Sequence, residues 1–145
     1  MIADVLAKAL NDVSAAAINA KLAKYNFGSG DAPVIFTAGV PDDAAFPAIV
    51  ITELDGEVWG CRAREGALCK ADVCIYDQKS HTSKDFRALA LALWKFLNRN
   101  ELAPWLDQSG FENWGCVALP PANTNEGFGF PGYVIRVQVN VLSNA

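Results

Sequence analysis

The chain has 145 residues, a formal net charge of −4 and 52% apolar residues. This length suits one compact domain, and the composition excludes a disordered chain. No apolar run approaches the ~20 residues that span a bilayer, and Asp4 and Lys8 interrupt the apolar start that a signal peptide needs. Lysine and arginine are scattered, without the basic stripe of nucleic-acid binders. We therefore expect a reducing cytosolic context, no membrane and no sequence-specific nucleic acid.

The first half of the chain predicts helices followed by strands. Helical spacing of apolar residues runs from Ile2 to Val13, and residues 14–25 continue this helix or begin a second one. Glycine and proline in "NFGSGDAP" stop the helical pattern. Short strands are predicted at Val34–Gly39 and, with strong β-branching, at 48–54.

The middle of the chain predicts a hairpin, a central strand and a long helix. The Asp55-Gly56 step is a turn signal, so an exposed hairpin or long loop is expected over 55–67. Leu68–Asp77 is apolar on both faces near its end, which favours a central strand covered on both sides. The helix after it should bury one face and leave Leu91 and Trp94 to widen its apolar surface for a second contact, such as another subunit. The predicted buried face comprises Phe86, Leu89, Ala90, Leu93, Phe96 and Leu97.

The last third predicts two strands around a long loop. Residues 110–119 form the first strand, and 120–132 form a loop rich in proline, asparagine and glycine. From Tyr133 to Val141, apolar residues alternate with Arg136, Gln138 and Asn140, so one face meets the core. The chain is therefore expected to be a single α+β domain over 1–145, with a mostly antiparallel or mixed β-sheet packed on one side by an N-terminal helix and a long central helix.

The segment around His81, the chain's only histidine, is the one place where a histidine-based catalytic mechanism could operate. A small hydrolase would use Ser80 as nucleophile and His81 as base, but adjacency does not aim one side chain at the other, and no G-x-S-x-G elbow exists. Thr82 followed by Asp85 matches a capping pattern, with Ser83 as the alternative N-cap. Helix capping is therefore preferred to catalysis.

Acidic clusters and cysteines carry no strong chemical signal. The acidic pair at 42–43 and the Glu53/Asp55/Glu57 group could bind a divalent cation or act as acid and base, yet such clusters are usually solvated loops. No cofactor is expected, because the glycine-rich stretches lack the nucleotide-binding patterns. Four cysteines lack the C-x-x-C spacing of zinc sites. Cys74 and Cys116 are expected to be small buried side chains. Cys61 and Cys69 would approach each other across a hairpin, although a reducing compartment disfavours a disulfide.

Aromatic residues in loop-like segments favour an interaction role. Trp59, Trp105, Phe128 and Phe130 lie in such segments, and aromatic residues are enriched at protein interfaces. Folding back under the sheet is the ordinary alternative for each of them. The two long glycine-containing loops that carry Trp59 and Phe128/Phe130 therefore favour a role in contacts with other proteins.

The order of these elements resembles the tail terminator (tail completion) proteins of long-tailed bacteriophages. The likeness is carried by "VIFTAGVPDDAAFPAIVITE", by "ADVCIYDQKSHTSKDFRALALALWKFLN" and by "GYVIRVQVNVLS". It spans nearly the whole chain, and each motif is a fold pattern with no catalytic signature. The resemblance implies a structural virion protein with no enzymatic activity.

That resemblance also implies partners and a location. Such proteins form a homohexameric ring that caps the tail tube, ends tube polymerisation and provides the head–tail joining surface. The partners would be further copies of the chain, the major tail tube protein and the head–tail connector or neck protein, with DNA passing through the ring. The location would be the head-proximal end of the virion tail, after assembly in the host cytoplasm. A neck or connector protein of related fold is the alternative.

Interface residues are expected in the hairpin, the long loop, the outer helix face and the last strand. The expected residues are Glu53, Asp55, Glu57, Trp59, Arg62, Arg64, Leu91, Trp94, Phe128, Phe130 and Arg136.

Overall fold

The computed structural model describes residues 2–26, 28, 30–37, 45–61, 64–77, 83–98, 103–108, 110–124 and 131–143. Within these ranges, the description does not extend to the side chains at 13, 59–61, 64, 103, 113 and 114.

The described helices are short except for two. Helix α1 spans Ile2–Asn11 and α3 spans Lys84–Leu97, and each presents one apolar face to the protein interior. A 3-10 turn, η1 (Val13–Ala15), leads into the one-turn helix α2 (Ala16–Asn19), and α4 covers Ala103–Gln108. No pattern in the sequence predicted α4.

One sheet organises the molecule. Its six strands are β3 (Ile35–Phe36), β4 (Ala48–Cys61), β5 (Arg64–Tyr76), β6 (Phe111–Ala118), β7 (Ala122–Thr124) and β8 (Gly132–Ser143). The order is β3-β4-β5-β8-β6. β6 pairs with residues 137–143 of β8, and β7 pairs with residues 132–134 at the start of β8. All neighbours are antiparallel except β3 and β4, which are parallel. A separate two-stranded hairpin joins β1 (Lys24–Asn26) to β2 (Asp31–Pro33).

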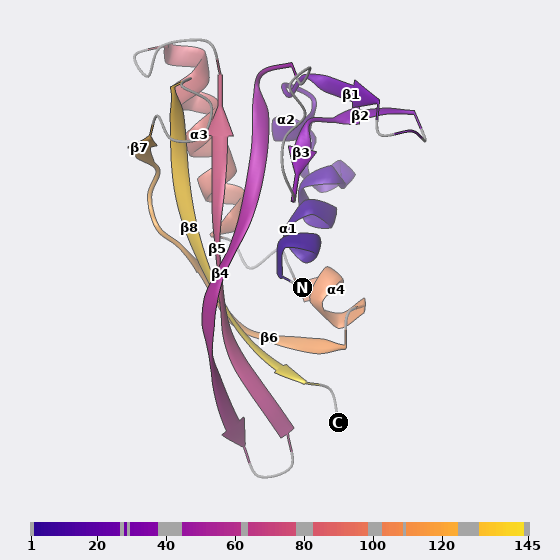
Figure 1. Cartoon of the computed structure of the whole chain (residues 1–145), viewed down its shortest axis with the longest axis vertical. Coiled ribbons are helices and arrows are strands. Elements are labelled where there is room, and N and C mark those ends of the chain that lie inside the picture. Colours follow the sequence, from indigo (N-terminus) through magenta and orange to yellow (C-terminus); the bar gives the residue numbers. More distant parts are fainter. Residues whose placement is uncertain are drawn as a thin grey trace.

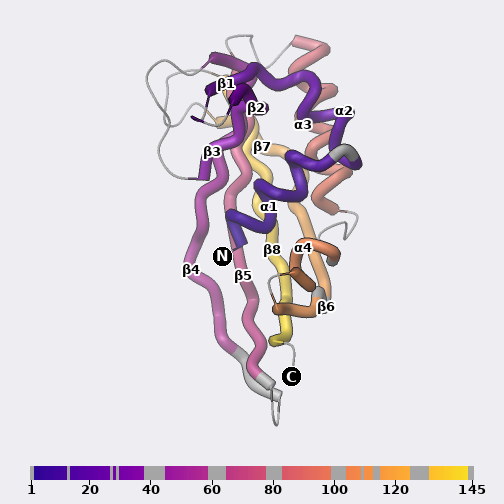
Figure 2. The backbone as a smooth tube through the Cα atoms, turned by 90° about the vertical axis from the view of Figure 1, so that its right-hand side faces the viewer, coloured from indigo at the N-terminus to yellow at the C-terminus, as the bar shows by residue number. Residues whose placement is uncertain are grey.

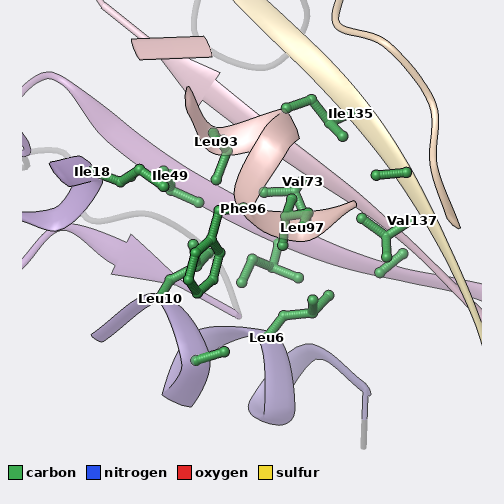
Figure 3. Close-up of a cluster of buried hydrophobic side chains, with 14 of the residues drawn as sticks. Leu6, Leu10, Ile18, Ile49, Val73, Leu93, Phe96, Leu97, Ile135 and Val137 are labelled. Atoms are coloured by element: carbon green, nitrogen blue, oxygen red, sulfur yellow. The ribbon is translucent and has the colours of Figure 1, made fainter. Parts of the chain in front are cut away.

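All described helices contribute to a core on one face of the sheet (Figures 1 and 2). Figure 3 shows the side chains that meet there: Leu6, Leu10, Ile18, Ile49, Val73, Leu93, Phe96, Leu97, Ile135 and Val137. The six α3 positions predicted from periodicity are all buried, and so are the five predicted apolar positions of β8. The expected α+β domain, with helices on one side of a mostly antiparallel sheet, is thus confirmed.

The opposite face of the sheet mixes polar and apolar side chains, most of them half-buried or exposed. Arg136 on β8 donates to both carboxylate oxygens of Asp72 on β5, at 2.9 and 3.1 Å. A small apolar cluster covers only one end of this face, where Tyr25 and Phe36 meet edge to face. Of the residues at 73–76 that were expected to be covered on both sides, Val73, Ile75 and Tyr76 are buried. Cys74, which was also expected to be buried, is only half-buried.

Two local predictions are also corrected. Tyr25 was expected on a helix, but it lies in β1, because Lys24–Asn26 pairs with Asp31–Pro33. The Asp55-Gly56 step is not a turn. It is a β-bulge, because β4 continues past it and stays paired with β5 as far as Cys61 and Arg64.

Candidate functional site

The hairpin of β4 and β5 projects far beyond the helices that cover the core (Figures 1 and 2). Its strands have 14 and 13 residues, and they pair from Ala48 and Tyr76 out to Cys61 and Arg64. We call residues 55–67, beyond the bulge, the distal hairpin. A paired arm that extends past its own core exposes surface well beyond what folding of this domain needs, so the distal hairpin is the first candidate for an interaction surface.

The edge of β4 adds backbone groups to this surface. β3 pairs with β4 only at Ile49 and Val50. Among the described strands, none pairs with that edge of β4 beyond Val50. An open edge presents N–H and C=O groups that can pair with another chain, and the bulge at Leu54/Glu57 interrupts its regularity.

The distal hairpin carries three acidic side chains that the structure describes, and two arginines, Arg62 and Arg64, whose side chains lie outside the description. Asp55, Glu57 and Glu65 are exposed, and Val58 is 86% exposed. Val58 pairs with Ala67, and Gly60 pairs with Glu65, so Val58 and Glu65 lie on the same face of the hairpin. This face combines a solvent-exposed apolar side chain with negative charge.

Glu53 was expected at the interface, but it contacts its own N-terminal helix. Its Oε1 accepts a hydrogen bond of 2.8 Å from the Ala3 amide, in the first turn of α1. The positive α-amino terminus and this amide hold the pKa of Glu53 below its ordinary value. A carboxylate at a helix N-terminus is also favoured by the helix dipole. Glu53 therefore links β4 to the N-terminus of α1 through this hydrogen bond.

Helix α3 carries an exposed stripe whose charged residues are basic. Lys84, Arg87, Leu91 and Lys95 are exposed and follow one another at helical spacing of three or four residues, and we call them the α3 stripe. Leu91, which is 48% exposed, lies between Arg87 and Lys95. Asp85 is also exposed, but it lies on another side of the helix.

A groove runs beside this stripe, between α3 and the chain that follows β6. It has a volume of about 430 Å³. We call it the α3 groove. Its lining includes Arg87, Leu91, Pro120, Pro121, Asn123 and Tyr133. The helical pattern predicted a second contact at Leu91, but no pattern in the sequence predicted this groove. The two prolines were the available signal, but nothing in the sequence places them next to α3.

Two other expected interface residues are engaged within the chain. The Trp94 indole N–H donates to the Ala118 carbonyl oxygen at 2.9 Å, so Trp94 joins α3 to β6. Arg136 lies on the face of the sheet opposite the helices, paired with Asp72, whose carboxylate raises the pKa of the guanidinium further. Neither residue lies on the α3 groove or the distal hairpin.

Several expected residues lie outside what the structure describes. This holds for the side chains of Trp59, Arg62, Arg64, Phe128 and Phe130. It also holds for the acids at 42–43 and for the hydrolase candidates Ser80 and His81, together with Thr82. Ser83 occupies the N-cap position of α3 with extended backbone and no side-chain capping hydrogen bond.

The cysteines do not form the disulfide considered from the sequence. Cys61 pairs with Arg64, five residues before Cys69 on β5, and Cys69 is a free thiol. A strand rises by about 3.4 Å per residue, so Cys61 and Cys69 lie ~17 Å apart along the hairpin. Cys116 is buried as expected, and its thiol donates to the Leu97 carbonyl oxygen at 3.3 Å. Burial raises the pKa of Cys116 to about 11, so this thiol stays protonated and unreactive at neutral pH.

Neither a metal cluster nor a membrane span is found in the described part of the chain. No group of three or more His, Cys, Asp or Glu side chains there converges in a way that would hold a metal ion. Of the helices described, none has both the length and the apolar character to cross a bilayer.

Comparison with known proteins adds no family assignment. The chain matches no protein-family model and no curated protein.

Proposed function

We propose that this protein is a structural subunit that caps the tail tube of a long-tailed bacteriophage as a ring. In this role it ends tube polymerisation and provides the surface that joins the tail to the head. Its partners are other copies of itself, the major tail tube protein and the connector or neck protein, and the role is not enzymatic. It acts at the head-proximal end of the tail.

The observation that carries the proposal is the distal hairpin. A subunit that caps a tube needs surface that reaches beyond its own core towards a neighbour or the tube. The hairpin of β4 and β5 extends past the helical layer, with Val58 86% exposed and an open β4 edge among the described strands. The likeness of the element order to tail terminator proteins supplies the particular assembly. The fold alone supports interaction in general.

A tube-capping experiment tests the role. Purified protein is added to polymerising tail tube protein, and tube length and tube ends are imaged by negative-stain electron microscopy. We expect shorter tubes with a ring of this protein at one end. Tubes of unchanged length with bare ends would contradict the proposal. Binding to the connector protein without any binding to tubes would instead favour a neck protein.

A further inference from the structure

We propose that the α3 groove binds an acidic segment of another protein, with a large apolar side chain of that segment entering beside Leu91. This inference goes beyond the proposed function, because it names a peptide-binding surface whose use does not depend on tube capping.

Apolar side chains lie beside and within the groove. Leu91 on α3 is 48% exposed, and Leu119, which directly precedes the groove residue Pro120, is 47% exposed. Pro120 and Pro121 add apolar lining. The groove has a volume of about 430 Å³. Since a cavity of about 150 Å³ already holds a benzene ring, the groove has room for a large apolar side chain, whose burial there would remove apolar area from water.

The charge of α3 favours an acidic occupant. The charged residues of the α3 stripe are Lys84, Arg87 and Lys95, and all of α3 belongs to the described part of the chain. The one acidic residue of the helix, Asp85, lines a different hollow. Leu91 lies between Arg87 and Lys95, so a segment that reaches Leu91 passes beside cations. Acidic side chains next to an apolar one therefore complement this surface.

A nucleic acid fits this surface less well than a protein segment. Its affinity would come mainly from phosphate contacts with many cations. Apolar side chains form the middle of this surface instead, and the chain as a whole carries a net charge of −4.

Hydrogen bonds hold the walls of the groove together before any partner binds. The Trp94 indole N–H donates to the Ala118 carbonyl oxygen at 2.9 Å, and the Ala118 N–H donates to Oδ1 of Asn98 at 3.1 Å. The Cys116 thiol donates to the Leu97 carbonyl oxygen at 3.3 Å. These contacts tie α3 to the end of β6, just before the two prolines. A groove that is already formed avoids part of the ordering cost of binding.

The same contacts decide how a partner binds. Ala118 has both its N–H and its C=O bonded to side chains of α3, and the Leu119 N–H donates to the Arg136 carbonyl oxygen. Pro120 and Pro121 have no N–H to donate. An added β-strand needs free backbone groups at the edge it joins, so this stretch does not accept one. Recognition therefore comes from side chains, and the apolar anchor and the charges decide the affinity.

A selection experiment tests the chemistry of the occupant. A library of random peptides is selected for binding to the whole wild-type chain. We expect the enriched sequences to carry aspartate or glutamate beside one large apolar side chain. Enriched peptides that are basic, or that lack the apolar residue, would overturn the proposal. So would a selection that yields no binding peptide.

Variants of the chain then locate the binding site of the enriched peptide. Leu91→Asp and Lys95→Glu should each weaken binding by about tenfold or more, measured by fluorescence anisotropy. Val58→Asp and Lys8→Glu are the matched controls, because both residues are exposed and neither lines the groove. Circular dichroism checks that all four variants remain folded. Equal affinity of the wild type and Leu91→Asp would show that the peptide binds elsewhere and would overturn the proposal.

A charge exchange tests the pairing of signs. A peptide whose acidic residues are replaced by lysine should bind the wild type about tenfold more weakly, and it should recover most of the loss on Lys95→Glu. Affinity for the original peptide should also fall as the salt concentration rises. A lysine peptide that binds the wild type as well as the acidic one would contradict the charge argument.

Other occupants are further outcomes of these experiments. Short duplex DNA that displaces the peptide at physiological salt would assign the surface to nucleic acid and overturn the proposal. Self-association that displaces the peptide and is abolished by Leu91→Asp would assign it to a second copy, with the same consequence. Tube capping is measured separately. A wild-type chain that binds acidic peptides but leaves tubes uncapped removes only the proposed function, and one that caps tubes but binds no peptide removes only this inference.

Discussion

At the scale of single residues, Glu53 shows how a side chain expected at an interface can serve the fold. Its place among Asp55 and Glu57 in the sequence made it one of an acidic group. The bulge between Leu54 and Glu57 changes the register of β4 against β5, and Glu53 lies before it, within reach of α1. Glu53 accepts a hydrogen bond from the Ala3 N–H. In the first turn of a helix this N–H has no carbonyl partner within the helix, so without Glu53 it would need a water molecule.

Replacing Glu53 by glutamine should therefore lower stability in a pH-dependent way. We expect Glu53→Gln to cost ~0.5–1 kcal/mol of unfolding free energy at pH 7, a small value because the carboxylate is exposed to water. The folded pKa of Glu53 is lowered, so its contribution is present above its ordinary value of 4.5 and is lost as the pH falls through the folded pKa. Urea unfolding followed by circular dichroism at a series of pH values measures this.

Glu57→Gln is the matched control for that measurement, since Glu57 is an exposed glutamate on the same strand. It should leave stability nearly unchanged at every pH. If the gap between the wild type and Glu53→Gln stayed constant down to strongly acidic pH, the stabilisation would not come from the charge of Glu53.

At the scale of elements, the long hairpin depends on one close approach of backbones. At the bulge, a Cβ on Gly56 would overlap the carbonyl oxygen of Leu68 on β5. A glycine in a strand often marks such a site. This glycine therefore has its role in strand pairing, and the Asp-Gly pair that resembled a turn signal is a place where two paired strands come close.

Gly56→Ala should loosen the distal hairpin while leaving the core intact. The added methyl group must push β4 away from Leu68, at a cost of ~1–3 kcal/mol. Hydrogen exchange should become faster at the amides of 55–67 and stay unchanged in α3. Glu57→Ala, one residue on and exposed, should change neither. Unchanged protection of the hairpin in Gly56→Ala would contradict the close approach.

Elements also differed in how well the sequence predicted them. The buried faces of α1, α3 and β8 were correct, because each repeats its apolar residues at the period of its own secondary structure. The turn at Asp55-Gly56 was wrong, because a local turn signal yielded to twelve cross-strand partners that run from Ala48 to Cys61. The short elements α4 and β7 were missed, since three to six residues carry too little periodicity to be recognised.

At the scale of the whole molecule, stability comes from the layer between α1, α3 and the sheet. Leu93 is fully buried in that layer, whereas Leu91, two residues earlier on the same helix, is 48% exposed. The two leucines therefore mark two different faces of α3. One face holds the domain together, and the other is available to a neighbour.

Leu93→Ala should therefore unfold the domain more readily, and Leu91→Ala should not. We expect Leu93→Ala to lower the free energy of unfolding by about 2–5 kcal/mol, through lost burial and the cavity left behind. Leu91→Ala should cost no more than about 0.5–1 kcal/mol, as a surface change. Urea unfolding of both variants at low protein concentration measures the difference. Equal losses would mean that Leu91 belongs to the core.

The candidate surfaces were only partly predictable. An exposed hairpin or long loop over 55–67 and an outer role for Leu91 were expected from the sequence. The α3 groove was not, because it joins α3 to Pro120 and Pro121, about thirty residues further along the chain. Trp94 was expected to face outward, but its indole is bound to Ala118 of β6, a partner that local spacing does not reveal.

The sequence by itself determined the helices and strands that have a long apolar period, the acidic net charge, and the single α+β domain. These properties depend on neighbouring residues, whose spacing decides which side of an element meets the core. The tertiary structure decided which face of the sheet meets the helices, how far the β4–β5 hairpin extends, and which segment lies beside α3. Those properties depend on register and packing between residues far apart in the chain, because every cross-strand partner must be satisfied at once. The hairpin reaches beyond the core because pairing with β5 and the bulge at Gly56 let β4 continue past the end of its helical cover.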